Sequence, residues 1–170
     1  MQENGEKERD RYIFDLVRSR CSEEFDRVKS LDNKASRIIA ISGIVLSLET
    51  SFVSVLFNNI PRGSNYYVAS RLLLITSFIF LLASVAISLK AYAIKTLKTV
   101  PDVEHLINEY ARQDKSFQDI LIPITLELVD AVEENKLING RKAEDITYSL
   151  YALGLGIFVY FLFVVGLLLV

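Results

Sequence analysis

One acidic residue inside an apolar stretch is the side chain with the clearest potential for chemistry. Glu49 lies near the middle of the run from Ile38 to Phe57, and this run of 20 residues carries no other charge. An apolar helix of about 20 residues is long enough to cross a hydrocarbon core of about 30 Å. A charge at its centre costs roughly 2.5–3.5 kcal/mol on insertion scales. An acid in this place therefore indicates a function or a partner within the fold.

Three states of Glu49 satisfy the physics. The carboxyl is a neutral acid hydrogen-bonded to a neighbouring hydroxyl, or it pairs with a cation inside the bundle, or it faces a hydrated cavity or an oligomer axis. No basic residue lies at mid-depth in any of the three apolar runs, which disfavours the pair. The sequence leaves a functional acid and a neutral structural glutamate equally open.

The same run carries a face of small and hydroxylated residues. A helix turns by about 100° per residue, which places the following residues on one face: Gly43, Ser47, Thr50, Ser51, Ser54 and Asn58. Ser42 and Glu49 lie roughly opposite. Small and hydroxylated residues let helices approach closely and bond across the contact. We therefore predict a packing seam in preference to a water-facing lining, although hydroxyls that line a pore would give the same pattern.

Three apolar runs predict an all-α membrane protein with three transmembrane helices. They are assigned to residues 37–59, 72–94 and 147–170, and the outer loop between the first two to residues 60–71. The cytosolic parts are an amphipathic N-terminal helix at residues 1–36 and a helical insert at residues 95–146.

The N-terminal helix is expected to continue into the first span. No Pro or Gly lies between Glu6 and Ser42, so we expect one helix from about Arg11 to Phe57, preceded by a frayed end. The insert is expected to contain a short helix near Tyr110 and a second over residues 114–137. Pro123 should kink the second helix, and Asn139-Gly140 should end it.

Apolar residues recur at three- and four-residue spacing in both polar segments. This pattern is typical of amphipathic helices that pack together. We therefore expect a cytosolic helical bundle formed by the N-terminal helix and residues 101–145 of the insert. The narrow stripes also favour packing between protomers, and hence a homo-oligomer.

Basic residues set the predicted orientation. Twelve lie beside the N-terminal helix and the two membrane ends of the insert, whereas the loop at 60–71 has only Arg62 and Arg71. The excess of positive charge predicts a multi-pass protein of the cell membrane, with a cytoplasmic N-terminus and a C-terminus outside. Asp32, Lys34 and Arg37 are expected at the cytosolic membrane interface, where the two cations can reach lipid headgroups.

The sequence has few residues suited to catalysis or metal binding. The chain has one cysteine, Cys21, and one histidine, His105, and it shows no catalytic triad spacing, phosphate-binding glycine loop or zinc motif. We therefore expect no enzyme activity, no cofactor and no metal site, and a reduced Cys21. The net charge of -2 argues against nucleic-acid binding.

Several residues together resemble the membrane modules of a group of prokaryotic defence proteins. They are Leu31-Asp32-Asn33-Lys34-Ala35-Ser36, Gly43 of the first span, Tyr110, and Asn135 with Lys142-Ala143. This layout resembles Pycsar-type transmembrane effectors and the related two-transmembrane effectors found with nucleotide-signalling defence systems. The resemblance implies oligomerisation triggered by a sensor, followed by membrane disruption. The sequence departs from those effectors because it contains no recognisable cyclic-nucleotide-binding domain.

Two functions follow as hypotheses. The first is a homo-oligomeric membrane channel or pore-forming protein, with antiviral defence as one setting, gated or assembled through its cytosolic helices. Its partners are the lipid bilayer, further copies of itself and ions, and Glu49 or the hydroxyl face lines its conduit. The second is a non-conducting membrane scaffold that docks a cytosolic partner.

Overall fold

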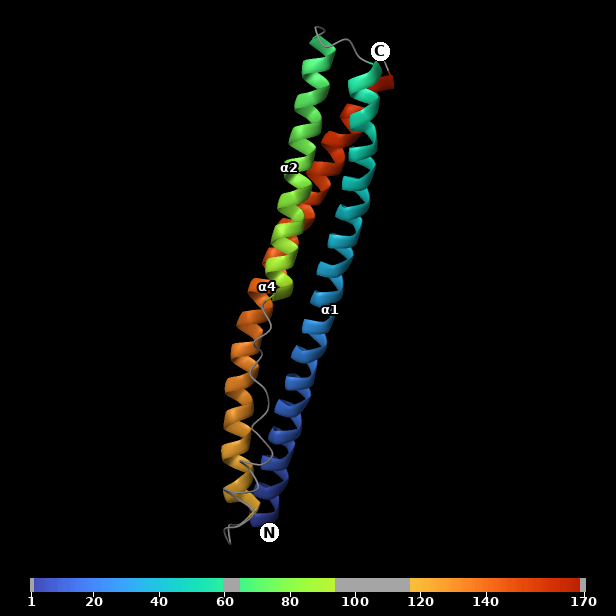
Figure 1. The fold of residues 1–170 in the computed structure, drawn as a ribbon. Helices are drawn as coiled ribbons and strands as arrows, with labels where there is room; N and C mark the ends of the chain where they lie inside the picture. Colours follow the sequence, from blue (N-terminus) through green and yellow to red (C-terminus); the bar gives the residue numbers. More distant parts are fainter. Residues whose placement is uncertain (1, 60–64, 94–116, 169–170) are drawn as a thin grey trace. The chain divides into compact units, whose positions relative to one another are not determined.

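The computed structural model describes residues 2–59, 65–93 and 117–168, and all of them are helical. The helices are α1 (Gln2–Asn59), α2 (Asn65–Ala93) and α4 (Phe117–Leu168), as Figure 1 shows. Each contains a stretch that is long and apolar enough to cross a membrane. The predicted all-helical architecture with three candidate membrane spans is therefore confirmed.

Contacts within the chain divide it into two compact units. The polar unit comprises Met1–Ser30 and Lys95–Arg141, and the apolar unit comprises Leu31–Ile94 and Lys142–Val170. Helices α1 and α4 contribute to both units, whereas α2 belongs to the apolar unit alone.

Helices α1 and α4 pack against each other in the polar unit. Cys21, Leu128 and Ala131 are buried there, as is Asn139. The side-chain amide of Asn139 donates to the backbone carbonyl of Glu24 at 3.1 Å and to its Oε2 at 2.7 Å. A charge-assisted bond of this kind fixes the register of two helices as well as stabilising their contact.

The predicted helix break at Asn139-Gly140 is wrong, because α4 continues through both residues. Among the described residues no glycine has a positive φ, so Gly140 has ordinary helical geometry. Glycine costs about 1 kcal/mol relative to alanine inside a helix. The bonds of Asn139 to Glu24, together with the ion pair of Lys142 with Asp32, outweigh this cost.

All three helices lie side by side in the apolar unit (Figure 1). One buried cluster joins Ile38 of α1, Leu81 of α2 and Leu153 of α4, and a second surrounds Phe163. The buried positions recur at three- and four-residue spacing. They are Leu31, Ala35, Ile38, Ser42 and Glu49 on α1; Tyr67, Ser70, Leu74, Ser77, Leu81, Ser84, Ser88 and Ala91 on α2; and Lys142, Ile146, Ser149, Leu153, Gly156 and Phe163 on α4. This spacing is that of helices whose side chains interlock along a seam.

Several helix ends differ from those predicted. Helix α1 begins at Gln2, so residues 2–10, which we expected to be frayed, are helical. Three of these nine residues are Glu, which is a good helix former. Helix α2 begins at Asn65, which places residues 65–71 in the helix instead of the expected loop. The predicted helix near Tyr110 and His105 lie outside the described residues.

Candidate functional site

Glu49 lies in the core of the apolar unit. Its side chain is on α1, and the residue is only 2% exposed. Among the described residues, neither carboxyl oxygen has a hydrogen-bond partner. Burying an ionised carboxylate without partners is among the most costly arrangements in a protein.

Two polar groups from the other helices interact with Glu49. Ser77 of α2 lies beside the carboxyl, and Tyr160 of α4 is within electrostatic range of it. The Ser77 hydroxyl, however, donates its hydrogen to the backbone carbonyl of Gly156 at 2.8 Å. With its hydrogen directed to Gly156, the Ser77 hydroxyl has none left to donate to the Glu49 carboxyl.

A groove between α1 and α2 reaches Glu49. The cavity has a volume of about 190 Å³ and is lined by Glu49, Thr50, Val53, Leu74, Ile75, Phe78 and Ile79. Its outer residues are exposed in the chain, and five of the seven lining residues are aliphatic or aromatic. The carboxyl therefore lies at the polar end of an apolar groove on the face that a lipid or a second helix would contact.

A second buried polar group is a cluster of serines that joins all three helices. Ser84 donates to the backbone carbonyl of Ser149 at 2.9 Å, and Ser149 donates to the backbone carbonyl of Ser84 at 2.8 Å. The hydroxyls of Ser88 and Ser149 are 2.6 Å apart, and those of Ser42 and Ser84 are 3.5 Å apart. These hydrogen bonds pair the buried hydroxyls inside the unit. Within a membrane, each such bond contributes about 1–2 kcal/mol or less to the association of the helices.

The hydroxyl face predicted from the sequence points away from this interior. Ser47, Thr50 and Ser51 are exposed, and each donates to a backbone carbonyl one turn earlier in α1, over 2.8–3.1 Å. Gly43 has open space around it. Within one chain these residues are therefore not the packing seam; the opposite face, with Ser42 and Glu49, is the buried one. The side chains of Ser54 and Asn58 lie outside what the structure describes.

The three predicted interface residues have different surroundings. Lys34 and Arg37 are exposed. Asp32 pairs with Lys142 of α4, with 2.5 Å between Oδ1 and Nζ, and the side chains are 29% and 1% exposed respectively. A second pair links Lys90 of α2 to Asp145 of α4 at 3.0 Å. The structure thus brings together Asp32 and Lys142, two of the residues on which the family resemblance was based.

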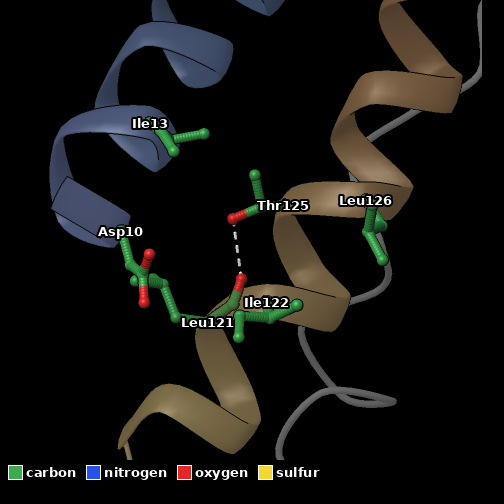
Figure 2. A pocket seen from close by; sticks show the side chains of 6 residues that line it. All are labelled: Asp10, Ile13, Leu121, Ile122, Thr125 and Leu126. Carbon is green, nitrogen blue, oxygen red and sulfur yellow. Dashed lines mark hydrogen bonds between the residues drawn. The ribbon is translucent and has the colours of Figure 1, made fainter. Parts of the chain in front are cut away.

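The polar unit contains small apolar cavities between α1 and α4. Figure 2 shows the one lined by Asp10, Ile13, Leu121, Ile122, Thr125 and Leu126, which has a volume of about 290 Å³. The Thr125 hydroxyl is turned toward its own helix, where it donates to the carbonyl of Leu121 at 2.7 Å. Another cavity is lined in part by Cys21, and burial raises the pKa of its thiol. Across residues 2–59, 65–93 and 117–168, no cluster of His, Cys, Asp or Glu is suited to hold a metal ion.

Ser77, Ser149 and Lys142 are the polar residues that the sequence analysis did not single out as sites. The signal that could have found them is regular spacing. Lys142, Ser149, Gly156 and Phe163 recur every seven residues along α4, as do Ser77 and Ser84 along α2. Polar residues that recur at this spacing, such as Ser77 with Ser84 and Lys142 with Ser149, predict a buried polar layer.

No family model, curated protein or solved structure matches this chain.

Proposed function

We propose that this chain is an integral membrane protein that forms a homo-oligomeric ion conduit, with Glu49 on or beside the path. The observation that carries the proposal is the placement of Glu49. It is a buried acid, without a hydrogen-bond partner among the described residues, inside a candidate membrane span. An ionisable residue at such depth is expensive and usually marks an ion or proton pathway.

The conduit has to lie between chains. In the apolar unit, Ser77, Leu81 and Ser84 are fully buried and the serine cluster fills the space between the helices, so the described core has no room for a path. The exposed small residues of α1, Gly43, Ser47 and Ser51, allow a second copy to approach closely. Thr50 belongs to this face and also lines the Glu49 groove, so a second copy seated here would lie beside the groove.

The polar unit is proposed to lie in the cytoplasm and to control assembly or gating. The distribution of basic residues supports this orientation. The resemblance to nucleotide-signalling defence effectors suggests one setting, in which a sensor triggers oligomerisation and the conduit permeabilises the cell membrane. Lys34 and Arg37, both exposed, would then lie at the cytosolic mouth.

A non-conducting scaffold is the second candidate. The observation that favours it is the pair of apolar cavities in the polar unit, one of them shown in Figure 2. Such cavities are suited to side chains of a protein partner. In that function Glu49 would have only a structural role.

Ion flux from liposomes separates the two. The purified protein is reconstituted, and wild type is compared with Glu49→Gln and with Glu127→Gln, an identical change at an exposed position of the polar unit. The conduit predicts flux that Glu49→Gln alters and Glu127→Gln does not, with the oligomer intact in all three. Absence of flux from a folded oligomer, over a range of voltages and pH values, would overturn the conduit and favour the scaffold.

A further inference from the structure

The hydrogen bonds around Glu49 restrict its protonation state. Ser77 has a single hydroxyl hydrogen, and this hydrogen is donated to the Gly156 carbonyl. Toward Glu49, Ser77 can therefore only accept a hydrogen bond. An ionised Glu49 would face an oxygen lone pair with no donor, whereas a protonated Glu49 has an O–H to donate to Ser77 Oγ.

The groove adds a second, independent restriction. Its lining beyond the carboxyl includes Val53, Ile75, Phe78 and Ile79, none of which can donate a hydrogen bond to an anion. Thr50 also lines the groove, but its hydroxyl donates to the backbone carbonyl of Leu46 at 2.8 Å. A carboxylate in such surroundings loses its hydration without compensation, whereas the neutral acid loses much less.

We propose that Glu49 is a proton-binding site, held in the resting protein as the neutral acid with its O–H directed to Ser77 Oγ. The ligand is the proton, which the carboxyl takes up and releases when the site is hydrated. This inference rests on the proposed conduit, because it names the proton as the ion that the conduit carries. It also assigns Ser77 as the residue that positions the acid.

Few other titratable groups face Glu49. Helix α2 has no charged residue between Arg71 and Lys90, and Tyr160 is the titratable residue of α4 within electrostatic range. Helix α1 itself has no second charge between Arg37 and Asn59. Uptake or release of a proton by a carboxyl within the span is therefore assigned to Glu49.

A hydrophobic carbodiimide tests the site directly. Dicyclohexylcarbodiimide dissolves in the bilayer and reacts with protonated carboxyls: the acid O–H adds across one C=N bond, and migration of the acyl group from oxygen to nitrogen gives a stable N-acylurea. The reconstituted full chain is treated over a range of pH, and the modified residue is identified by mass spectrometry. We expect labelling of Glu49 that decreases as pH rises, and none in Glu49→Gln. Glu127→Gln should be labelled at Glu49 like the wild type.

Infrared spectra of the same samples test the protonated state without a reagent. The carbonyl stretch of a protonated acid should be present in the wild type, absent in Glu49→Gln and shifted in Ser77→Ala. Ser88→Ala, which removes a buried hydroxyl bonded to Ser149 instead, should leave the band unchanged.

Two results would overturn the proton site. One is a spectrum with no acid band that depends on Glu49. The other is protection from labelling by sodium ions at constant pH, which would make the ligand a metal cation. The flux experiment tests the conduit independently of the proton site. If Glu49 is labelled and titrates but the protein conducts no ions, the conduit is refuted and the proton site stands. If the protein conducts ions but Glu49 is not protonated, the proton site is refuted and the conduit stands.

Discussion

Gly156 of α4 packs directly against Leu81 of α2. A Cβ at this position would lie 2.9 Å from Leu81 Cγ, 3.0 Å from Cδ2 and 3.4 Å from the Leu81 backbone nitrogen. Leu81 is fully buried, so its side chain has little freedom to move away. Gly156→Ala is therefore expected to force the two helices apart.

Gly154 is the matched control for this substitution. It lies two residues earlier in the same helix, and a Cβ there meets nothing within 4 Å. Replacing glycine by alanine in a helix gains about 0.5–1 kcal/mol at either position. Overpacking costs about 1–3 kcal/mol and applies only at Gly156. The difference between the two variants therefore isolates the clash, and we expect Gly156→Ala to be the less stable by about 1–3 kcal/mol.

Unfolding by increasing SDS in mixed micelles, followed by circular dichroism, measures this difference. A double-mutant comparison sharpens it: in a Leu81→Ala background, which removes the atoms that the new Cβ meets, Gly156→Ala should lose most of its penalty. Equal stabilities of Gly154→Ala and Gly156→Ala would refute the close packing of α2 on α4.

Three further predictions concern polar side chains. Asp32→Asn should cost about 1–3 kcal/mol of unfolding free energy, because it removes the carboxylate that pairs with the fully buried Lys142 ammonium; Asp145→Asn, which removes the partner of the exposed Lys90, should cost about 1 kcal/mol or less. Ser149→Ala should cost about 1–2 kcal/mol, since it removes bonds to α2. Cys21 is buried, and burial raises the pKa of its thiol, so it should react slowly with maleimide in the folded protein and faster as pH rises.

Each of these has a result that contradicts it. Equal losses in Asp32→Asn and Asp145→Asn would mean that the burial of Lys142 does not strengthen its ion pair relative to that of Lys90. A Ser149→Ala variant as stable as Ser47→Ala, which loses only a bond within its own helix, would mean that the serine cluster contributes nothing. Labelling of native Cys21 at the rate seen in SDS, at neutral pH, would show that the thiol is accessible.

The three candidate spans could be predicted from the sequence because a bilayer would impose their length. An apolar run of about 20 residues has few other uses in a small chain. The buried face of each span could not be predicted in the same way, since hydrophobic residues surround the whole helix and polarity no longer separates the inside from the outside. The hydroxyl face of α1 illustrates this: Ser47 and Ser51 satisfy their hydroxyls on their own backbone and stay exposed, whereas Ser42 is buried.

The break predicted at Asn139-Gly140 failed for a different reason. Local propensity favours a helix end at these two residues, but propensity is a weak term that contacts between helices routinely exceed. Asn139 binds Glu24 of α1, a residue distant in sequence whose position no local pattern reveals. Glu49, in contrast, is a candidate functional residue from the sequence alone, because an acid in an apolar run can be recognised without knowledge of the fold.

Proton flux across a reconstituted membrane shows whether Glu49 lies on a proton-conducting path. Liposomes containing the wild-type oligomer and a pH-sensitive dye are given a pH gradient, with the membrane potential clamped, and compared with Glu49→Gln and Glu127→Gln. The account predicts a dissipated gradient in the wild type and in Glu127→Gln, and its loss in Glu49→Gln with assembly unchanged. A gradient that decays equally in all three proteins, or in none of them, would contradict it.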